Sequence, residues 1–150
     1  CGWNKLLPSD ILEIPGKACL NCHSSLLPDY KGASVYNHYW SNCETEAGAT
    51  VHYMNEKFDA GNIICSKKVR HFWYNTPKSI LYRISEVTGL LIREAILLVE
   101  NDYKGIPQSG GRYFYRISFV EHVLYRIYNV FALLFGFSKK ITPHKILDNQ

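Results

Sequence analysis

The sequence predicts an α/β protein, in which strands and helices alternate along the chain. Short segments rich in β-forming residues occur at 17–23, 49–54 and 62–69. Apolar residues recur at helical spacing at 33–40 and 78–98. Such alternation is typical of a sheet flanked by helices. About three strands are visible, fewer than the five or six of a typical sheet. We therefore expect part of the fold to lie N-terminal to this chain.

The first elements are a short helical turn and a short buried strand. The turn covers 10–14, and Ser9 precedes it as the expected N-cap. In the strand at 17–23, Asn21 and His23 are two positions apart. Because side chains alternate across a strand, both should project from one face, roughly 6–7 Å apart.

The middle of the chain predicts a helix at 33–40, followed by strands at 49–54 and 62–69. The loop at 55–61 that separates the two strands is rich in turn formers. The strands could pair as a hairpin or lie side by side after a longer excursion.

A long helix should follow, because Thr76 and Pro77 form a typical helix start. Its apolar spacing extends over 78–98, and Gly89 is where an interruption is expected. Alternating aromatic and basic residues then predict an edge strand at 112–118.

The last predicted element is a helix over 120–135, with Gly136 as its C-cap. Its broad apolar stripe favours packing on the sheet, with a dimer interface or a membrane-surface contact as alternatives. Glu121, His122 and Arg126 interrupt the stripe, which argues against a membrane span.

Composition fits one globular domain, with 47% hydrophobic and 20% charged residues over 150 positions. The net charge of +4 is scattered rather than collected in a dense basic run, so no nucleic-acid surface is predicted. Five irregularly spaced cysteines and no visible signal peptide indicate reduced thiols in a cytoplasmic protein.

Residues 19–23 match the C-x-x-C-H pattern of covalent haem attachment. A strand would place Cys19 and Cys22 on opposite faces, because they are three positions apart. For zinc, no second C-x-x-C or H-x₃-H completes a ligand set. We therefore expect neither haem nor metal, and interpret the thiols as small buried side chains.

Asn21 and His23 are the candidate catalytic pair, and Asp59 in the loop at 55–61 is their expected partner. A carboxylate near His23 should orient the imidazole and raise its pKa. The Asn21 amide would donate to a developing oxyanion. These groups suit acyl transfer to an amine, and the alternative is a hydrogen-bonded structural histidine.

These residues resemble the formyltransferases that use 10-formyltetrahydrofolate, a family with glycinamide ribonucleotide, methionyl-tRNA and nucleotide-sugar enzymes. The first block is Asn21-Cys22-His23-Ser24-Ser25-Leu26-Leu27-Pro28, closed by Gly32. The second is Ala49-Thr50-Val51-His52 with Phe58-Asp59-Ala60-Gly61. Upstream, Gly2-Trp3-Asn4-Lys5-Leu6-Leu7 is similar to the loop that lines the folate pocket. The resemblance covers about residues 1–100.

The resemblance implies a Rossmann-like fold, with a mostly parallel sheet flanked by helices and apparently lacking its N-terminal half. Residues 1–105 would form the C-terminal half of the catalytic domain, and 106–150 a C-terminal extension. The other half supplies the first strands and, in the ribonucleotide enzyme, a phosphate-binding glycine loop.

The resemblance also implies roles for individual residues. Asn21, His23 and Asp59 would form the catalytic triad: Asn21 and His23 stabilise the oxyanion, and Asp59 helps to move the proton. Ser24 and Ser25 would contact the acceptor; many members carry Pro, Ala or Gly in place of Ser24. The residues implied to bind the folate co-substrate are Trp3, Asn4, Lys5, Leu6, Leu7, Asn55, Glu56, Lys57 and Phe58.

The expected acceptor follows from the positions at which this sequence differs from members of the family. The segment 87–89 stands where ribonucleotide enzymes carry Glu-His, and the chain has no room for the C-terminal barrel of methionyl-tRNA enzymes. The segments 106–108 and 113–115 look mildly like the nucleotide-sugar enzymes. We therefore expect a nucleotide-linked amino sugar, with no nucleic acid, no membrane span and an optional homodimer through the C-terminal helix. The alternatives are glycinamide ribonucleotide, methionyl-tRNA, hydrolysis of 10-formyltetrahydrofolate, or a truncated homologue that acts as a binding module.

Overall fold

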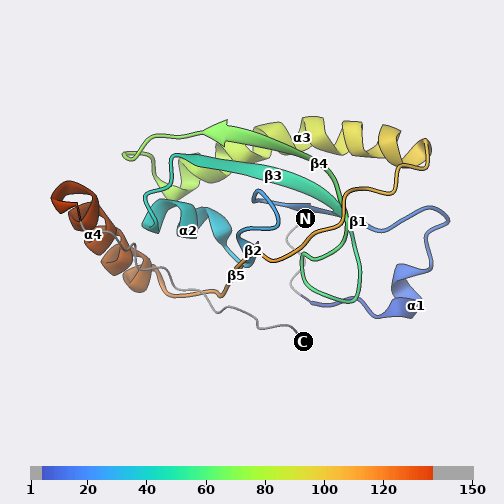
Figure 1. Ribbon diagram of the computed structural model, residues 1–150, viewed down its shortest axis with the longest axis horizontal. Helices are drawn as coiled ribbons and strands as arrows, with labels where there is room; N and C mark the ends of the chain where they lie inside the picture. The colour runs from blue at the N-terminus through green and yellow to red at the C-terminus, as the bar shows by residue number, and fades with distance from the viewer. Residues whose placement is uncertain (1–4, 137–150) are drawn as a thin grey trace.

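The computed structural model describes residues 5–136 and has a mixed α/β architecture, as predicted (Figure 1). One long helix, α3, runs along the strands of the main sheet, and α4 lies at one end of the molecule (Figure 1). The elements in chain order are α1 (Ser9–Leu12), β1 (Leu20–His23), β2 (Lys31–Gly32), α2 (Val35–Ser41), β3 (Glu46–Tyr53), β4 (Ile63–Arg70), α3 (Pro77–Glu100), β5 (Tyr113–Phe114) and α4 (Phe119–Phe135).

The main sheet has the order β1-β3-β4, and both of its strand pairs are antiparallel. The hairpin alternative for the second and third predicted strands is therefore confirmed. The expected parallel pairing is confined, within residues 5–136, to the small β2–β5 pair. For β3 and β4 the physical reason is their short connecting loop, since a parallel pair would need a longer crossover connection.

The core lies between α3 and the sheet. Ile80, Ile84 and Leu91 on α3 are almost fully buried, as are Ala49 and Val51 on β3. The predicted helix start is confirmed, because the Thr76 side chain accepts a hydrogen bond from the Ser79 amide at 3.2 Å. The helix is continuous to its end at Glu100.

Gly89 therefore does not interrupt α3, contrary to expectation. It faces open space, with no heavy atom within 4 Å of an added Cβ. Its intrinsic cost of about 1 kcal/mol is offset by the packing of the apolar residues on either side.

Two further local predictions were wrong. Ser9 is the first residue of α1 rather than its N-cap; the cap position is Pro8, whose carbonyl accepts from the amides of Ile11 and Leu12. The strand expected at 112–118 is limited to β5, because the carbonyl of Tyr115 is turned away to accept from His38 Nε2 at 2.9 Å.

The C-terminal helix is confirmed, with Ser118 and Glu121 in a capping box and Gly136 in the left-handed C-cap conformation (φ 72°). It packs on α2, whereas the sequence predicted that it would pack on the sheet. Within residues 5–136, no helix combines the length and apolarity that a membrane crossing requires.

Candidate active site

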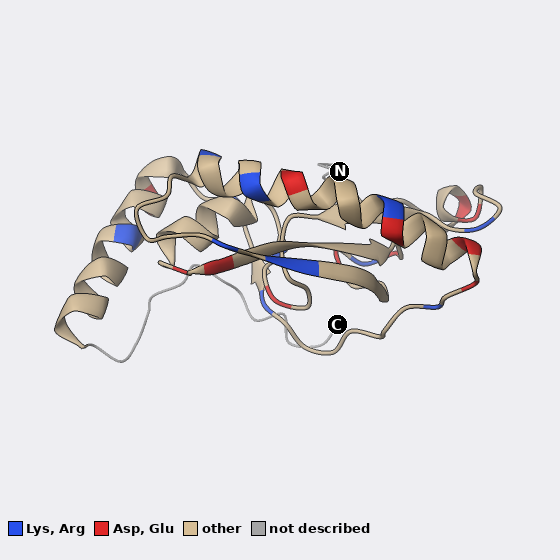
Figure 2. Ribbon diagram, turned by 90° about the horizontal axis from the view of Figure 1, so that it is seen from above, with Lys and Arg blue, Asp and Glu red and all other residues tan. Residues whose placement is uncertain are grey.

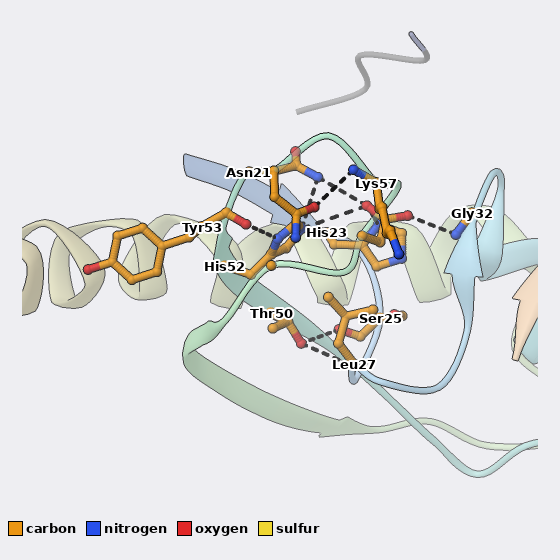
Figure 3. A network of polar contacts seen from close by, with 12 residues as sticks. Asn21, His23, Ser25, Leu27, Gly32, Thr50, His52, Tyr53 and Lys57 are labelled. Carbon is orange, nitrogen blue, oxygen red and sulfur yellow. Dashed lines mark hydrogen bonds and ion pairs between the residues drawn. The ribbon is translucent and has the colours of Figure 1, made fainter. Parts of the chain in front are cut away.

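The three predicted catalytic residues meet at the carboxylate of Asp59. Asn21 Nδ2 donates to Asp59 Oδ1 at 3.3 Å, and His23 Nδ1 lies 3.4 Å from the same oxygen. The Gly32 amide donates to the other oxygen at 2.8 Å, as the dashed line to labelled Gly32 shows (Figure 3). Strand alternation places Asn21 and His23 on one face, as predicted, and the β3–β4 loop brings Asp59 over them.

The backbone geometry at position 32 requires a glycine. Its φ is +100°, and an added Cβ would lie 2.3 Å from the carbonyl oxygen of Phe114. Glycine alone tolerates both conditions. The β2–β5 pairing thus holds the Gly32 amide where it contacts Asp59.

His52 is a fourth member of the site, to which sequence analysis gave no role. It is directly across the sheet from Asn21 and 2% exposed. Its Nδ1 donates to the carbonyl of Tyr53 at 2.7 Å, so its Nε2 accepts from Asn21 Nδ2 at 3.3 Å. Asp59 Oδ1 lies 3.7 Å from Nε2. The signal that could have identified His52 is the β1–β3 register, which is fixed by the folded sheet.

The pKa of His23 is lowered, whereas the sequence predicted that Asp59 would raise it. Burial is the main cause, because the side chain is 9% exposed; the charge of Asp59 and the carbonyl of Tyr30 oppose it only in part. His23 Nε2 donates to the Tyr30 carbonyl at 2.8 Å, which leaves Nδ1 to face the carboxylate. A proton placed between Nδ1 and Asp59 Oδ1 would convert this contact into a hydrogen bond.

The pKa of Asp59 is lowered overall. Burial raises it, but the nearby imidazole of His52, the charge of His23 and the Gly32 amide together outweigh that effect and lower the pKa. Asp59 is therefore ionised at neutral pH and is able to accept a proton that arrives through His23.

The loop after β1 is held by Thr50. Its Oγ1 donates to the carbonyl of Ser25 at 2.6 Å and accepts from the Leu27 amide at 3.1 Å (Figure 3). Ser25 itself is fully buried, with its Oγ donating to the carbonyl of Asp29. The structure thus places Ser25 inside the loop, whereas Ser24 lines the large cavity described next.

A cavity of about 910 Å³ opens on one side of the trio. Asn21, His23 and Asp59 form part of its wall, together with Thr88 and Gly89 of α3. Arg116 is the one Lys or Arg among the described residues that line it. Tyr113 also lines it, with its ring 5.0 Å from that of Tyr115 and 6.4 Å from that of Phe58.

A crevice of about 30 Å³ lies beside Asn21, His52 and Asp59. It brings together the two loops predicted to hold the folate. Glu56 is exposed and outside its lining, and Trp3 and Asn4 fall outside the described residues. The predicted folate residues that line it are Lys5, Leu6, Leu7, Asn55, Lys57 and Phe58.

Among residues 5–136, no group of three or more His, Cys, Asp and Glu side chains is arranged to hold a metal ion. Cys19, Cys22 and Cys65 are free thiols. Burial raises the pKa of both Cys22 and Cys65, which makes them poor metal ligands and nucleophiles at neutral pH.

Comparison with known proteins finds one matching family model, described as formyl transferase, over residues 1–96. Curated relatives are methionyl-tRNA formyltransferases. That of Alkaliphilus oremlandii is 34% identical over 108 residues, which are 71% of this chain and 35% of the relative. That of Desulforamulus reducens is 35% identical over 108 residues, or 71% and 34%. The chain thus spans about a third of the length of the curated relatives it matches.

Solved structures that match this chain include two at 27% identity. The formyltransferase PseJ from Anoxybacillus kamchatkensis, in complex with UDP-4,6-dideoxy-4-formamido-L-AltNAc and tetrahydrofolate, has a TM-score of 0.66 over 95% of this chain and 70% of its own. An N-formyltransferase from Helicobacter canadensis, in complex with folinic acid and dTDP-3-aminofucose, has a TM-score of 0.61 over 65% and 37%.

Proposed function

The chain belongs to the formyl transferase family, and on that premise we propose that it transfers a formyl group from 10-formyltetrahydrofolate to the primary amine of a nucleotide-linked amino sugar. The observation that carries the proposal is that Asn21, His23 and Asp59 meet, with the large cavity on one side of them and the small crevice on the other. Within the proposal, residues 1–105 are the C-terminal part of the catalytic domain, and 106–150 are an extension of it.

The reaction forms one C–N bond and breaks another. The acceptor amine attacks the formyl carbon, the carbonyl oxygen becomes an oxyanion, and the C–N bond to the folate then breaks. The amine loses one proton and the folate nitrogen gains one, so no proton is consumed overall. The protein therefore has two tasks, which are to stabilise the oxyanion and to carry the proton.

Asn21 is the proposed oxyanion donor. Both of its amide contacts, to Asp59 Oδ1 and His52 Nε2, are long at 3.3 Å. Exchanging one of them for a charged oxygen costs little, because hydrogen bonds of this length are weak and bonds to an anion are strong.

His23 and Asp59 are the proposed proton carriers. The proton lost by the amine would lie between His23 Nδ1 and Asp59 Oδ1, which are 3.4 Å apart. In this structure His23 Nε2 is engaged by the Tyr30 carbonyl at 2.8 Å. A second oxyanion bond from His23 would require that contact to open, so the geometry favours the proton-carrying role.

The crevice beside Lys5–Leu7 is the proposed pterin side. At about 30 Å³ it holds roughly one water molecule, so the pterin would have to displace part of the 5–7 segment. Leu6 is 49% exposed and therefore has little packing to lose. The folate compounds in complex with the two solved relatives support this choice of co-substrate.

The large cavity is the proposed acceptor side. Arg116 in the wall of the same cavity suits an acceptor with phosphate groups, and Tyr113 offers a ring face for a base or sugar. Ser24 lies on the same wall. The sugar nucleotides bound by the solved relatives favour an amino sugar. Methionyl-tRNA is a second candidate because the curated relatives act in that class.

The test uses the natural protein at its full length, with 10-formyltetrahydrofolate and one acceptor at a time. The acceptors are nucleotide-linked amino sugars, methionyl-tRNA and glycinamide ribonucleotide. We expect tetrahydrofolate release that depends on an amino sugar, with a formamide product in the mass spectrum. Asp59→Asn should abolish release, whereas Asp102→Asn, at an exposed carboxylate, should not. Release with water alone, or with another acceptor only, would overturn the proposal.

A further inference from the structure

Helix α4 turns its polar side chains toward the protein. His122 and Asn129 are 1% and 0% exposed. Asn129 Nδ2 donates to the Ser41 carbonyl at 2.9 Å, and His122 Nδ1 lies 3.2 Å from Ser41 Oγ. Arg126 is also turned inward, because it donates to the carbonyls of Trp40 and Trp73. Polar bonds, rather than an apolar stripe, therefore attach α4 to α2.

The opposite face of α4 is apolar and exposed. The large residues on it recur at steps of four, three, four and three, which is the repeat of a helix that packs along another helix. We name these residues the α4 seam. They are Val120, Leu124, Ile127, Phe131 and Leu134, with 67%, 61%, 51%, 54% and 73% of their surface exposed.

We propose that the α4 seam packs against the same seam of a second copy of the chain, in a two-fold symmetric dimer. This proposal is independent of the proposed function. A symmetric contact needs a surface that complements itself, and an apolar helical seam with no charged residue meets that need. His122 and Asn129 face α2 on the far side of the helix, so the pairing would leave their bonds intact.

The available area agrees with a dimer. Tyr128 and Phe135 flank the seam and are 42% and 66% exposed. At roughly 150–200 Å² for a large side chain, the seam and its flanks expose on the order of 800 Å² of apolar surface. A standard interface buries about 800 Å² on each partner. The face is therefore large enough for a stable pair.

A lipid surface fits this face less well. A helix that lies on a membrane carries Lys and Arg along the edges of its apolar face. The charged residues of α4 are Glu121, which is engaged in the capping box, and Arg126, which is turned inward. Figure 2 shows the helix almost wholly in the colour of uncharged residues. The chemistry of the seam therefore favours another helix.

Light scattering coupled to gel filtration, on the full-length natural protein over a range of concentrations, tests the proposal. The key comparison is Leu134→Glu, in the seam, against Leu133→Glu, at the preceding residue, which is 57% exposed and outside the seam. We expect the wild type and Leu133→Glu to be dimeric. Leu134→Glu should weaken the dimer by roughly 30- to 100-fold, with an unchanged circular dichroism spectrum.

A second seam variant, Phe131→Glu, keeps the test valid if Leu134→Glu misfolds. A monomeric wild type at all concentrations would overturn the proposal. So would dimers that neither seam variant weakens. A monomeric wild type that sediments with phosphatidylcholine–phosphatidylserine vesicles would assign the seam to lipid. A monomer that both seam variants destabilise thermally would assign it to another segment of the same chain.

Discussion

The replacement of Thr50 by valine isolates the hydrogen bonds that hold the loop between His23 and Gly32. Valine has nearly the shape of threonine, so the change removes the hydroxyl without opening a cavity. Thr50 is fully buried, and its hydroxyl joins the Ser25 carbonyl at 2.6 Å to the Leu27 amide at 3.1 Å. Both backbone groups would lose this partner in the variant.

The expected loss follows from these two groups. A buried polar group left without a partner costs roughly 1–3 kcal/mol, so the loss of both should lower the free energy of unfolding of Thr50→Val by about 2–6 kcal/mol. Urea denaturation of the full-length protein measures this value. Thr45→Val is the matched control, because Thr45 is exposed, and its change should stay within about 0.5 kcal/mol.

Amide hydrogen exchange gives a local readout of the same change. The Leu27 amide should exchange faster in Thr50→Val, since it loses its acceptor. Formyl transfer should fall as well, because the same loop carries the Gly32 amide that contacts Asp59. A Thr50→Val protein with wild-type stability and an unchanged Leu27 exchange rate would refute this reasoning.

Three further predictions concern a glycine, a buried histidine and the acceptor. Gly32→Ala should cost about 2–4 kcal/mol in urea denaturation because of the 2.3 Å approach to Phe114, whereas Gly110→Ala, also at positive φ but in open space, should cost about 1 kcal/mol; equal losses would contradict the steric argument. Burial lowers the pKa of His38 from 6.5 to about 4. The stability that neutral His38 contributes is therefore present above pH 6.5, and up to about 3 kcal/mol of the free energy of unfolding is lost as the pH falls toward 4. In His38→Asn the urea midpoint should change less with pH over this range. An unchanged dependence of the midpoint on pH would exclude His38 as the cause. Arg116→Ala should raise KM for a nucleotide-linked acceptor by roughly 10- to 100-fold with kcat little changed, whereas exposed Arg93→Ala should leave both constants unaltered.

The sequence predicts those features of the fold that depend on local patterns. The helix start at Thr76 and Pro77 and the C-cap at Gly136 follow from the chemistry of those residues, and the structure confirms them. The error at Ser9 is one residue, because the helix already begins at Ser9 and its N-cap position falls on Pro8. Strand direction was predicted less well, because pairing depends on contacts between distant segments.

The candidate site shows the same division. Alternation along β1 was sufficient to predict that Asn21 and His23 share a face, and the family motif identified Asp59. The pKa of His23 was predicted with the wrong sign because burial, which comes from the whole fold, outweighs its charged neighbour. The part of His52 likewise required the β1–β3 register. The sequence showed that polar residues interrupt the apolar stripe of α4, but it could not show that they face the protein, because their partner Ser41 lies on a distant helix.

The fate of the formyl carbon tests the central claim most directly. The full-length protein would be given 10-formyltetrahydrofolate labelled with carbon-13 in the formyl group, together with a nucleotide-linked amino sugar, and followed by carbon-13 NMR. We predict that the label moves into a formamide on the sugar, and that Asp59→Asn prevents the transfer. Label that appears as free formate, or a formamide that still forms in Asp59→Asn, would contradict this prediction.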